Sequence, residues 1–134
     1  MKKYPEKIII AWCEAISGNT ELRDWLMKNN YPELALFCYA LYFDKSASDW
    51  LMKNAPHLLA IIKGVEGKKD AIHWLEINGF KLLARLAKAA DNDHDQMRWL
   101  MLNDKLFGVI AQRIKLVKDE IEQTNNDIHR WGYE

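Results

Sequence analysis

Apolar residues recur along this chain with a period of about 25 residues. The pair Trp-Leu occurs four times, and an asparagine stands four places after each tryptophan, so the shared unit reads Trp-Leu-x-x-Asn. The repeated tryptophans are Trp25, Trp50, Trp74 and Trp99. The hexamer DWLMKN is present in full at 24–29 and again at 49–54. A fixed period of this length indicates an internal structural repeat.

A second set of apolar positions lies nine, twelve, thirteen and sixteen residues before each tryptophan. In the unit of Trp50 these positions are Leu41, Cys38, Phe37 and Leu34. The spacings predict one face of an amphipathic helix, because a strand would alternate apolar and polar residues. Ten residues before each tryptophan the residue is always small, which lets a neighbouring helix approach closely; these residues are Ala15, Ala40, Gly64 and Ala89.

Each unit therefore predicts two helices, a short one with the Trp-Leu pair and a longer one with the second stripe. Five longer and four short helices are expected in total. The recurring asparagine should end the short helix, because Asn tolerates the left-handed backbone found at helix C-termini. Pro32 and Pro56 suit the first turn of the helix that follows. Ser46 and Asp93 are the expected N-caps of two short helices.

Two helices of roughly 8 to 12 residues cannot bury their apolar faces alone, so successive pairs must stack and share a core. We predict an all-α fold in which tandem two-helix repeats of about 24–25 residues stack as a short solenoid, or αα-superhelix, forming a single domain over 1–134. The four tryptophans should lie inside the stack as wedges between pairs.

The last segment departs from the period. Residues 104–134 are expected to hold a longer C-terminal capping helix, which ends before Thr124 and exposes its outer side to water. A tail follows, whose Trp131 either folds back onto the stack or marks a contact.

The segment GKKDAIHWLEINGFKLLARLAKAADND at 67–93 places a Trp-Leu helix, an Asn-Gly corner and a Leu-Ala helix in succession. It resembles the helical pair of ankyrin repeats without their projecting hairpin, and α-helical tandem-repeat proteins in general. The resemblance implies an α-solenoid scaffold that binds proteins or peptides.

The composition is that of a folded and electrically balanced domain. Hydrophobic residues make up 49% of the 134 residues, with only six glycines and three prolines. Nineteen basic residues balance nineteen acidic ones, so a charged partner must be met by a local patch. Two lysines precede the apolar run 8–13, but Pro5, Glu6 and Lys7 separate them from it and the run is too short for a signal peptide. We therefore predict a cytoplasmic protein that does not enter membranes.

Residues that could carry chemistry are scattered. The DNDHD run at 91–95 lacks the glycine and the glutamate of a calcium loop, so it is interpreted as a polar loop with a helix cap. The two cysteines, Cys13 and Cys38, share one stripe position and should be buried. The histidines fall in different units and are expected at the surface: His57, His73, His94 and His129. These observations predict no metal, no cofactor and no catalytic site, and hence a protein that is not an enzyme.

Aromatic residues at outward positions give the first candidate binding site. Tyr39 and Tyr42 occupy places that are polar or charged in the other units, and Phe43 follows where the other units have Gly18, Gly67 and Asn92. Exposed aromatic rings are enriched at the centres of contacts. Tyr39, Tyr42, Phe43 and Lys63 are therefore the candidate contact with a protein, a peptide or a second copy of the chain. The alternative is that these rings only cover a curved end of the stack.

Basic residues give a second candidate. Lys63, Lys81, Arg85 and Lys88 could form a strip that binds nucleic acid or phosphate, extended by Arg113 and Lys115. The overall charge balance and the neighbouring aspartates at 91, 93 and 95 disfavour nucleic acid as the partner.

Overall fold

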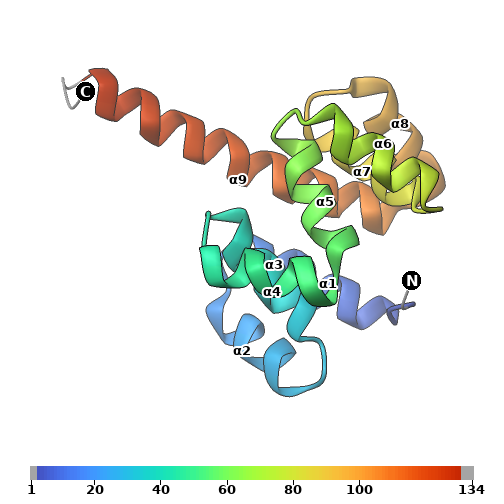
Figure 1. Cartoon of the computed structure of the whole chain (residues 1–134), viewed down its shortest axis with the longest axis vertical. Coiled ribbons are helices and arrows are strands. Elements are labelled where there is room, and N and C mark those ends of the chain that lie inside the picture. The colour runs from blue at the N-terminus through green and yellow to red at the C-terminus, as the bar shows by residue number, and fades with distance from the viewer. Residues whose placement is uncertain (1–2, 131–134) are drawn as a thin grey trace.

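The computed structural model describes the backbone of residues 3–130 and the side chains of residues 3–124. This part of the chain contains nine α-helices and no strand. The helices are α1 (Glu6–Ile16), α2 (Thr20–Lys28), α3 (Pro32–Leu41), α4 (Lys45–Asn54), α5 (Pro56–Val65), α6 (Lys69–Ile77), α7 (Lys81–Ala90), α8 (His94–Asn103) and α9 (Lys105–Arg130) (Figure 1). The predicted all-α stack of helix pairs is confirmed.

The odd-numbered helices form the centre of the stack. Each packs against the next odd-numbered helix, and each even-numbered helix packs against the two helices next to it in the chain. The two classes are nearly equal in length, because α2, α4, α6 and α8 span 9 or 10 residues while α1, α3, α5 and α7 span 10 or 11. The expected difference between long and short helices is therefore wrong for all but α9.

The stack closes on itself at α9. This helix contacts α7, α8 and also α1, the first helix of the chain. The guanidinium of Arg113 donates to Ser17 Oγ at 2.7 Å and lies 3.4 Å from the Glu14 carboxylate. The longer C-terminal helix is confirmed, and its contact with α1 makes its first half part of the shared core. Its predicted end before Thr124 is wrong, because the helix continues to Arg130 (Figure 1).

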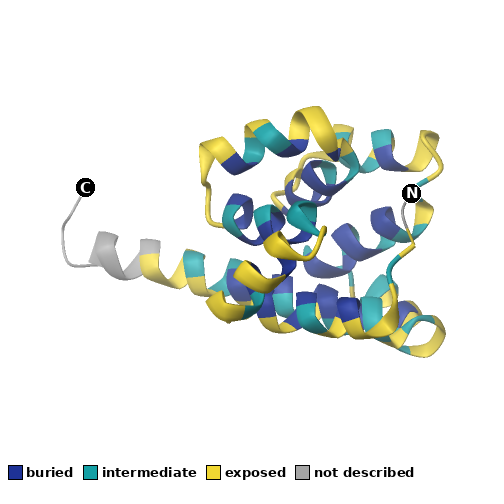
Figure 2. Ribbon diagram, turned by 90° about the horizontal axis from the view of Figure 1, so that it is seen from below, coloured by how far each residue is buried: buried dark blue, intermediate teal, exposed yellow. Residues whose placement is uncertain are grey.

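The predicted apolar stripe forms the core. All sixteen of its residues are buried, including Trp12, whose ring meets that of Phe37 edge-on with 5.1 Å between ring centres. In Figure 2 the buried residues gather on the sides of the helices that face one another. The small residue Gly64 lies where α5, α6 and α7 approach closely. A Cβ placed there would lie 2.6 Å from Ile72 Cδ1 and 3.0 Å from Ala87 Cβ, which confirms the packing reason for a glycine.

The tryptophans are not the wedges of the stack. The leucine of every Trp-Leu pair is fully buried, whereas Trp25 is 43% exposed, Trp99 is 37% exposed and the other two repeat tryptophans are half-buried. Successive residues of a helix point about 100° apart, so only one member of each pair can point into the core. The leucine takes that place, and the indole ring lies at the side of the helix.

The recurring asparagine ends each tryptophan helix, but by another means than expected. Its side-chain Nδ2 donates to the backbone carbonyl of the tryptophan four residues earlier, in all four units. The donors are Asn29 at 2.7 Å, Asn54 at 2.9 Å, Asn78 at 2.8 Å and Asn103 at 2.9 Å. Asn29 and Asn78 have negative φ, and the left-handed residue is the one after each of them, Asn30 and Gly79. The asparagine side chain thus adds a second hydrogen bond to a carbonyl of the last turn, which in α2 and α6 also accepts the backbone N–H of the same asparagine.

The helix starts follow local sequence signals. Pro32 and Pro56 begin α3 and α5 as predicted. Asp93 caps α8 by accepting from Gln96 N at 3.2 Å, also as predicted. The predicted cap Ser46 is wrong, because Asp44 accepts from Ala47 N at 2.9 Å and begins α4 two residues earlier. No helix within residues 3–130 combines the length and the apolar character needed to cross a membrane.

Candidate interaction surface

Phe43 lies in the turn between α3 and α4 and is 66% exposed. Its φ of 69° is in the left-handed region, where the corresponding turns have Gly18, Gly67 and Asn92. Glycine and asparagine enter this region readily, whereas a bulky side chain is strained there. The turn therefore carries a large apolar ring at a position where its own backbone favours a smaller residue.

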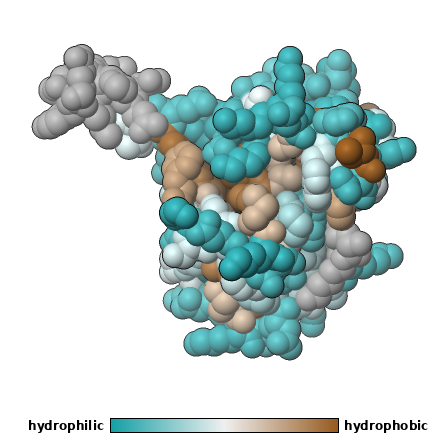
Figure 3. Space-filling model, viewed as in Figure 1, coloured by the Kyte–Doolittle hydropathy of each residue, from teal (hydrophilic) through white to brown (hydrophobic). Residues whose placement is uncertain are grey.

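An apolar groove of about 240 Å³ lies beside this ring. Its walls are the C-terminal ends of α3 and α5 and the middle of α9. The apolar lining residues are Leu41, Phe43, Ile62, Val65 and Ile121. The charged residues at its edge are Glu66, Glu122 and Lys118, and the Lys118 ammonium is paired with the Asp91 carboxylate. Figure 3 shows hydrophobic atoms gathered in a hollow in the region where α9 passes the α3–α4 turn.

Tyr39 and Tyr42 are partly engaged within the fold. Arg23 on α2 is only 7% exposed, and its guanidinium carbon lies 5.0 Å from the ring centre of Tyr39 and 5.9 Å from that of Tyr42. Arg23 Nε also donates to the Ala15 carbonyl at 2.8 Å. No ion pair of Arg23 is present among the described residues, so the partners of its charge are the Ala15 carbonyl and the two aromatic faces. Tyr39 is half-buried, while Tyr42 keeps 42% of its surface exposed.

Lys63 lies in a different groove from Phe43. This second groove, of about 390 Å³, runs between α4, α5 and α6. Met52, Pro56, Leu59, Ala60, Ala71 and Trp74 line it together with Lys63. The Lys63 ammonium lies 3.6 Å from the Glu66 carboxylate, and that pair separates the two grooves along α5. The four candidate residues inferred from the sequence are thus divided between two surfaces.

The other basic residues of the predicted strip line a third groove, of about 170 Å³, between α6, α7 and α8. Its lining is Glu76, Lys81, Ala84, Arg85, Lys88 and Gln96. Arg85 donates to Gln96 Oε1 at 2.9 Å and stacks over the Trp99 ring, with 4.0 Å from the guanidinium carbon to the ring centre. Lys88 lies 3.6 Å from Glu76. Arg113 and Lys115 are paired elsewhere, with Glu14 and Asp119 respectively. The strip is therefore partly neutralised by the fold.

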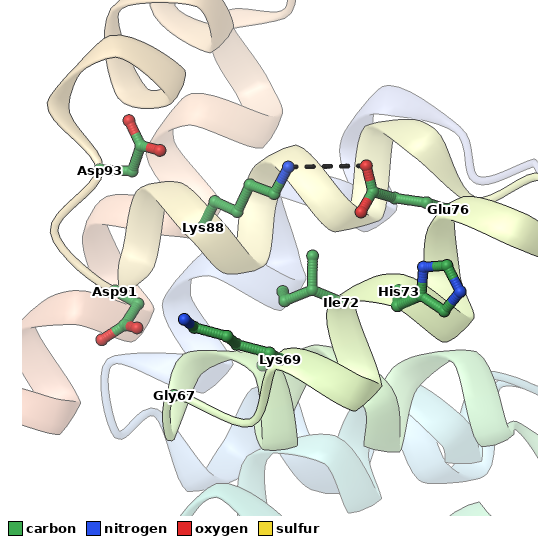
Figure 4. A pocket seen from close by; sticks show the side chains of 9 residues that line it. Gly67, Lys69, Ile72, His73, Glu76, Lys88, Asp91 and Asp93 are labelled. Atoms are coloured by element: carbon green, nitrogen blue, oxygen red, sulfur yellow. Dashed lines mark ion pairs between the residues drawn. The ribbon is translucent and has the colours of Figure 1, made fainter.

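A polar cleft of about 390 Å³ adjoins the third groove (Figure 4). Figure 4 shows the Glu76–Lys88 ion pair bridging one side of it above Ile72, with Asp91 and Asp93 on the other side. The carboxylates already have structural partners, since Asp91 pairs with Lys118 and Asp93 caps α8. The cleft is therefore interpreted as a by-product of packing around Gly64 rather than as a reactive site.

The residues considered for chemistry have ordinary structural roles. Cys13 and Cys38 are buried free thiols as predicted, and burial raises the pKa of Cys38 to about 12. His73 and His94 are exposed as predicted. His57 is a correction, because it is half-buried and stacks on Phe80 with 5.0 Å between ring centres, and burial lowers its pKa. His129 and Trp131 lie outside the residues whose side chains are described.

Among residues 3–124, no group of three or more His, Cys, Asp or Glu side chains is arranged to hold a metal ion. The candidate binding features of this part of the chain are its exposed aromatic rings and its grooves.

Sequence reasoning missed Arg23 and Met52. Two residues before the tryptophan, the other units have Ser48, Ile72 and Met97, so an arginine at that partly buried position was a detectable exception. Two residues after it, methionine recurs in three units, and its side chain is exposed at Met27 (40%) and Met52 (61%).

The sequence matches no protein-family model, and searches of curated proteins and of solved structures give no match. Function is therefore inferred from the chemistry of these surfaces.

Proposed function

We propose that the chain is a non-catalytic interaction module, which binds a protein or peptide partner through the groove beside Phe43. One observation supports this most strongly: an exposed phenylalanine in a left-handed turn. A side chain with a Cβ is less stable than glycine in this backbone conformation by about 1 kcal/mol. A ring that is mostly exposed gives the fold little in return, whereas a partner that covers it gains about 1.5–3 kcal/mol from burial.

The chemistry of the groove suits an apolar side chain. Leu41, Ile62, Val65 and Ile121 form its walls, and the carboxylates of Glu66 and Glu122 lie at its edge. Glu122 forms no ion pair within the described part of the chain. A partner with an apolar anchor and a nearby basic residue fits this arrangement. The partner can be another protein or a second copy of this chain.

We further assign the module to the cytoplasm. Cys13 and Cys38 are buried free thiols, which suits a reducing compartment. Binding of nucleic acid through the basic strip is less favoured, because Arg85, Lys88 and Arg113 already have polar, aromatic or acidic partners.

The test is a quantitative pull-down from an extract of the native host with the intact chain as bait. Phe43→Gly should lower recovery of the specific partner about tenfold, as expected for the loss of about 1.4 kcal/mol of contact energy. Tyr39→Ala combined with Tyr42→Ala should lower it less, because Tyr39 is half-buried. Asn92→Gly is the matched control, since it changes another left-handed turn (φ 70°) and Asn92 is not among the residues that line the groove.

Sedimentation equilibrium of the same proteins decides whether the partner is a second copy. In that case the wild-type chain forms dimers and Phe43→Gly does not. Equal recovery with Phe43→Gly and wild type, together with the same oligomeric state, would show that this groove is not the binding site.

A further inference from the structure

The second and third grooves are built from the same positions of successive repeats. Counted back from the tryptophan of their own unit, the residues at eighteen, fifteen, fourteen, eleven and three places line both. In the second groove they are Pro56, Leu59, Ala60, Lys63 and Ala71, and in the third they are Lys81, Ala84, Arg85, Lys88 and Gln96. The residue two places after the preceding tryptophan closes each groove, Met52 in one and Glu76 in the other. The two grooves are therefore equivalent pockets of a repeating surface.

The packing of the helices explains why such pockets exist. Helices α4, α6 and α8 contact their neighbours in the chain, but no contact joins one of them to another within residues 3–130. A gap is left between successive even-numbered helices, with an odd-numbered helix as its floor. The tryptophan ring at the side of each even-numbered helix lies at this gap: Trp74 lines the second groove, and Trp99 holds Arg85 of the third.

The two pockets differ in chemistry. The second is apolar apart from Lys63, whose charge is compensated by Glu66 at 3.6 Å. The third contains Lys81, Arg85 and Lys88 and a single carboxylate, Glu76. Lys81 is exposed and has no ion pair among the residues described. Two positive charges are thus in excess in this pocket, on a chain whose formal net charge is zero.

The spacing of the pockets suits an extended peptide. Helices packed side by side lie about 8–10 Å apart, and an extended chain advances about 3.3 Å per residue. Pockets on neighbouring repeats are therefore about three residues apart along a ligand that crosses the helices. From this geometry we infer a second binding surface, which takes an extended peptide with an apolar residue in the second groove and an aspartate or glutamate three residues away in the third groove.

This inference shares with the proposed function the premise that the chain binds proteins, but it uses the opposite side of the Lys63–Glu66 pair from Phe43. A peptide fits better than a nucleic acid, because a phosphate backbone would meet an apolar pocket in the second groove. It would also meet the carboxylates of Glu76, Asp91 and Asp93 beside the third.

The test begins with selection of random dodecapeptides displayed on phage against the intact chain. Enriched peptides should share an acidic residue three positions from a leucine, methionine or aromatic residue. Affinity of a selected peptide is then measured by fluorescence polarisation. The variant Lys81→Gln with Lys88→Gln should weaken binding about tenfold, as expected for loss of charge-assisted contacts. Glu76→Gln should strengthen binding about twofold, because it removes the only carboxylate of the pocket.

The matched control is Lys45→Gln with Lys105→Gln, which also removes one paired and one unpaired lysine, but outside the grooves. It should leave affinity within about twofold. A peptide in which glutamine replaces the acidic residue should bind weakly, and its affinity should be the same for the wild-type chain and for the Lys81→Gln, Lys88→Gln variant. Phe43→Gly should not change peptide affinity, so failure of the Phe43 groove and failure of this surface are distinguishable.

Three results would overturn the inference. The first is a selection that returns no shared acidic position. The second is an affinity that the groove lysines change no more than the control lysines do. The third is a labelled oligothymidylate that binds the chain more tightly than any selected peptide and loses affinity steeply with salt, which would identify the surface as a nucleic-acid site.

Discussion

Replacing Gly64 by alanine should destabilise the protein, although the same change in most helix interiors does the opposite. Gly64 lies within α5, where alanine is favoured over glycine by about 1 kcal/mol on helix propensity alone. The new Cβ would lie 2.6 Å from Ile72 Cδ1 on α6 and 3.0 Å from Ala87 Cβ on α7. The first neighbour is the end of a flexible side chain and can move, whereas the second moves only with the backbone of α7.

The size of the effect follows from these two terms. Overpacking of a tight helix contact costs about 1–3 kcal/mol. This cost is larger than the gain of about 1 kcal/mol from helix propensity over most of that range. We expect a net loss of about 1 kcal/mol. With an unfolding entropy of about 2.1 cal/mol/K per residue, such a loss lowers the melting temperature of a chain of this length by about 4 °C.

Circular dichroism melts and urea titrations of four proteins measure this directly: wild type, Gly64→Ala, Ala87→Gly and the double variant. The double variant moves the methyl group from α7 to α5 and relieves the contact with α7, which cannot relax by a side-chain movement. The two changes should therefore couple favourably, by at least about 0.5 kcal/mol in the cycle. An increase in stability for Gly64→Ala, or strict additivity of the two changes, would show that α5 and α7 do not approach as closely as described.

Three further predictions follow from other parts of the structure. Asn54→Ala should lower the free energy of unfolding by about 1 kcal/mol in urea titrations, because it removes the side-chain hydrogen bond to the Trp50 carbonyl. The control Lys53→Ala should change it little, and equal losses would contradict the capping role of Asn54. Phe43→Gly should be more stable than Phe43→Ala by about 1 kcal/mol in thermal melts, since only glycine removes the strain of a positive φ, and the reverse order would refute that strain. Cys38 should resist Ellman's reagent at pH 8 until the chain is unfolded, and rapid labelling would contradict its burial. Burial raises the pKa of the Cys38 thiol in the folded state to about 12, above its value in the unfolded chain. The stability that the neutral thiol contributes is therefore fully present below about pH 9 and is lost as the pH rises to about 12. Cys38→Ala should reduce this loss of stability in urea titrations at increasing pH.

Much of the fold could be predicted from the sequence because helix formation and burial leave local signals. The stripe of Leu34, Phe37 and Cys38 and its counterparts identified the buried faces of the odd-numbered helices. Gly64 was recognised as a close contact from its alignment with alanines in the other units. The candidate site was predicted less well. Phe43 was identified by its exceptional place in the repeat, whereas Lys63 was grouped with it and lies in another groove.

Some errors arose where two arrangements satisfy the same pattern. A Trp-Leu pair contains two apolar residues on adjacent positions, and the sequence does not say which of them points inward. The buried leucines and the partly exposed Trp25 settle that question. His57 is similar, since its stacking on Phe80 depends on how α5 lies against the turn after α6.

The sequence by itself determined the repeat, the two helices of each unit, the core-facing residues of the odd-numbered helices and the helix ends at asparagine and proline. These depend on the 3.6-residue period of the helix and on the preferences of single residues, which are properties of short segments. Only the tertiary structure decided that α9 returns to α1, that the even-numbered helices leave grooves between them, and that an apolar pocket adjoins a basic one. These features depend on the rotation from each helix pair to the next. That rotation is set by the packing of whole surfaces, and small differences accumulate over the units until the stack either stays open or closes.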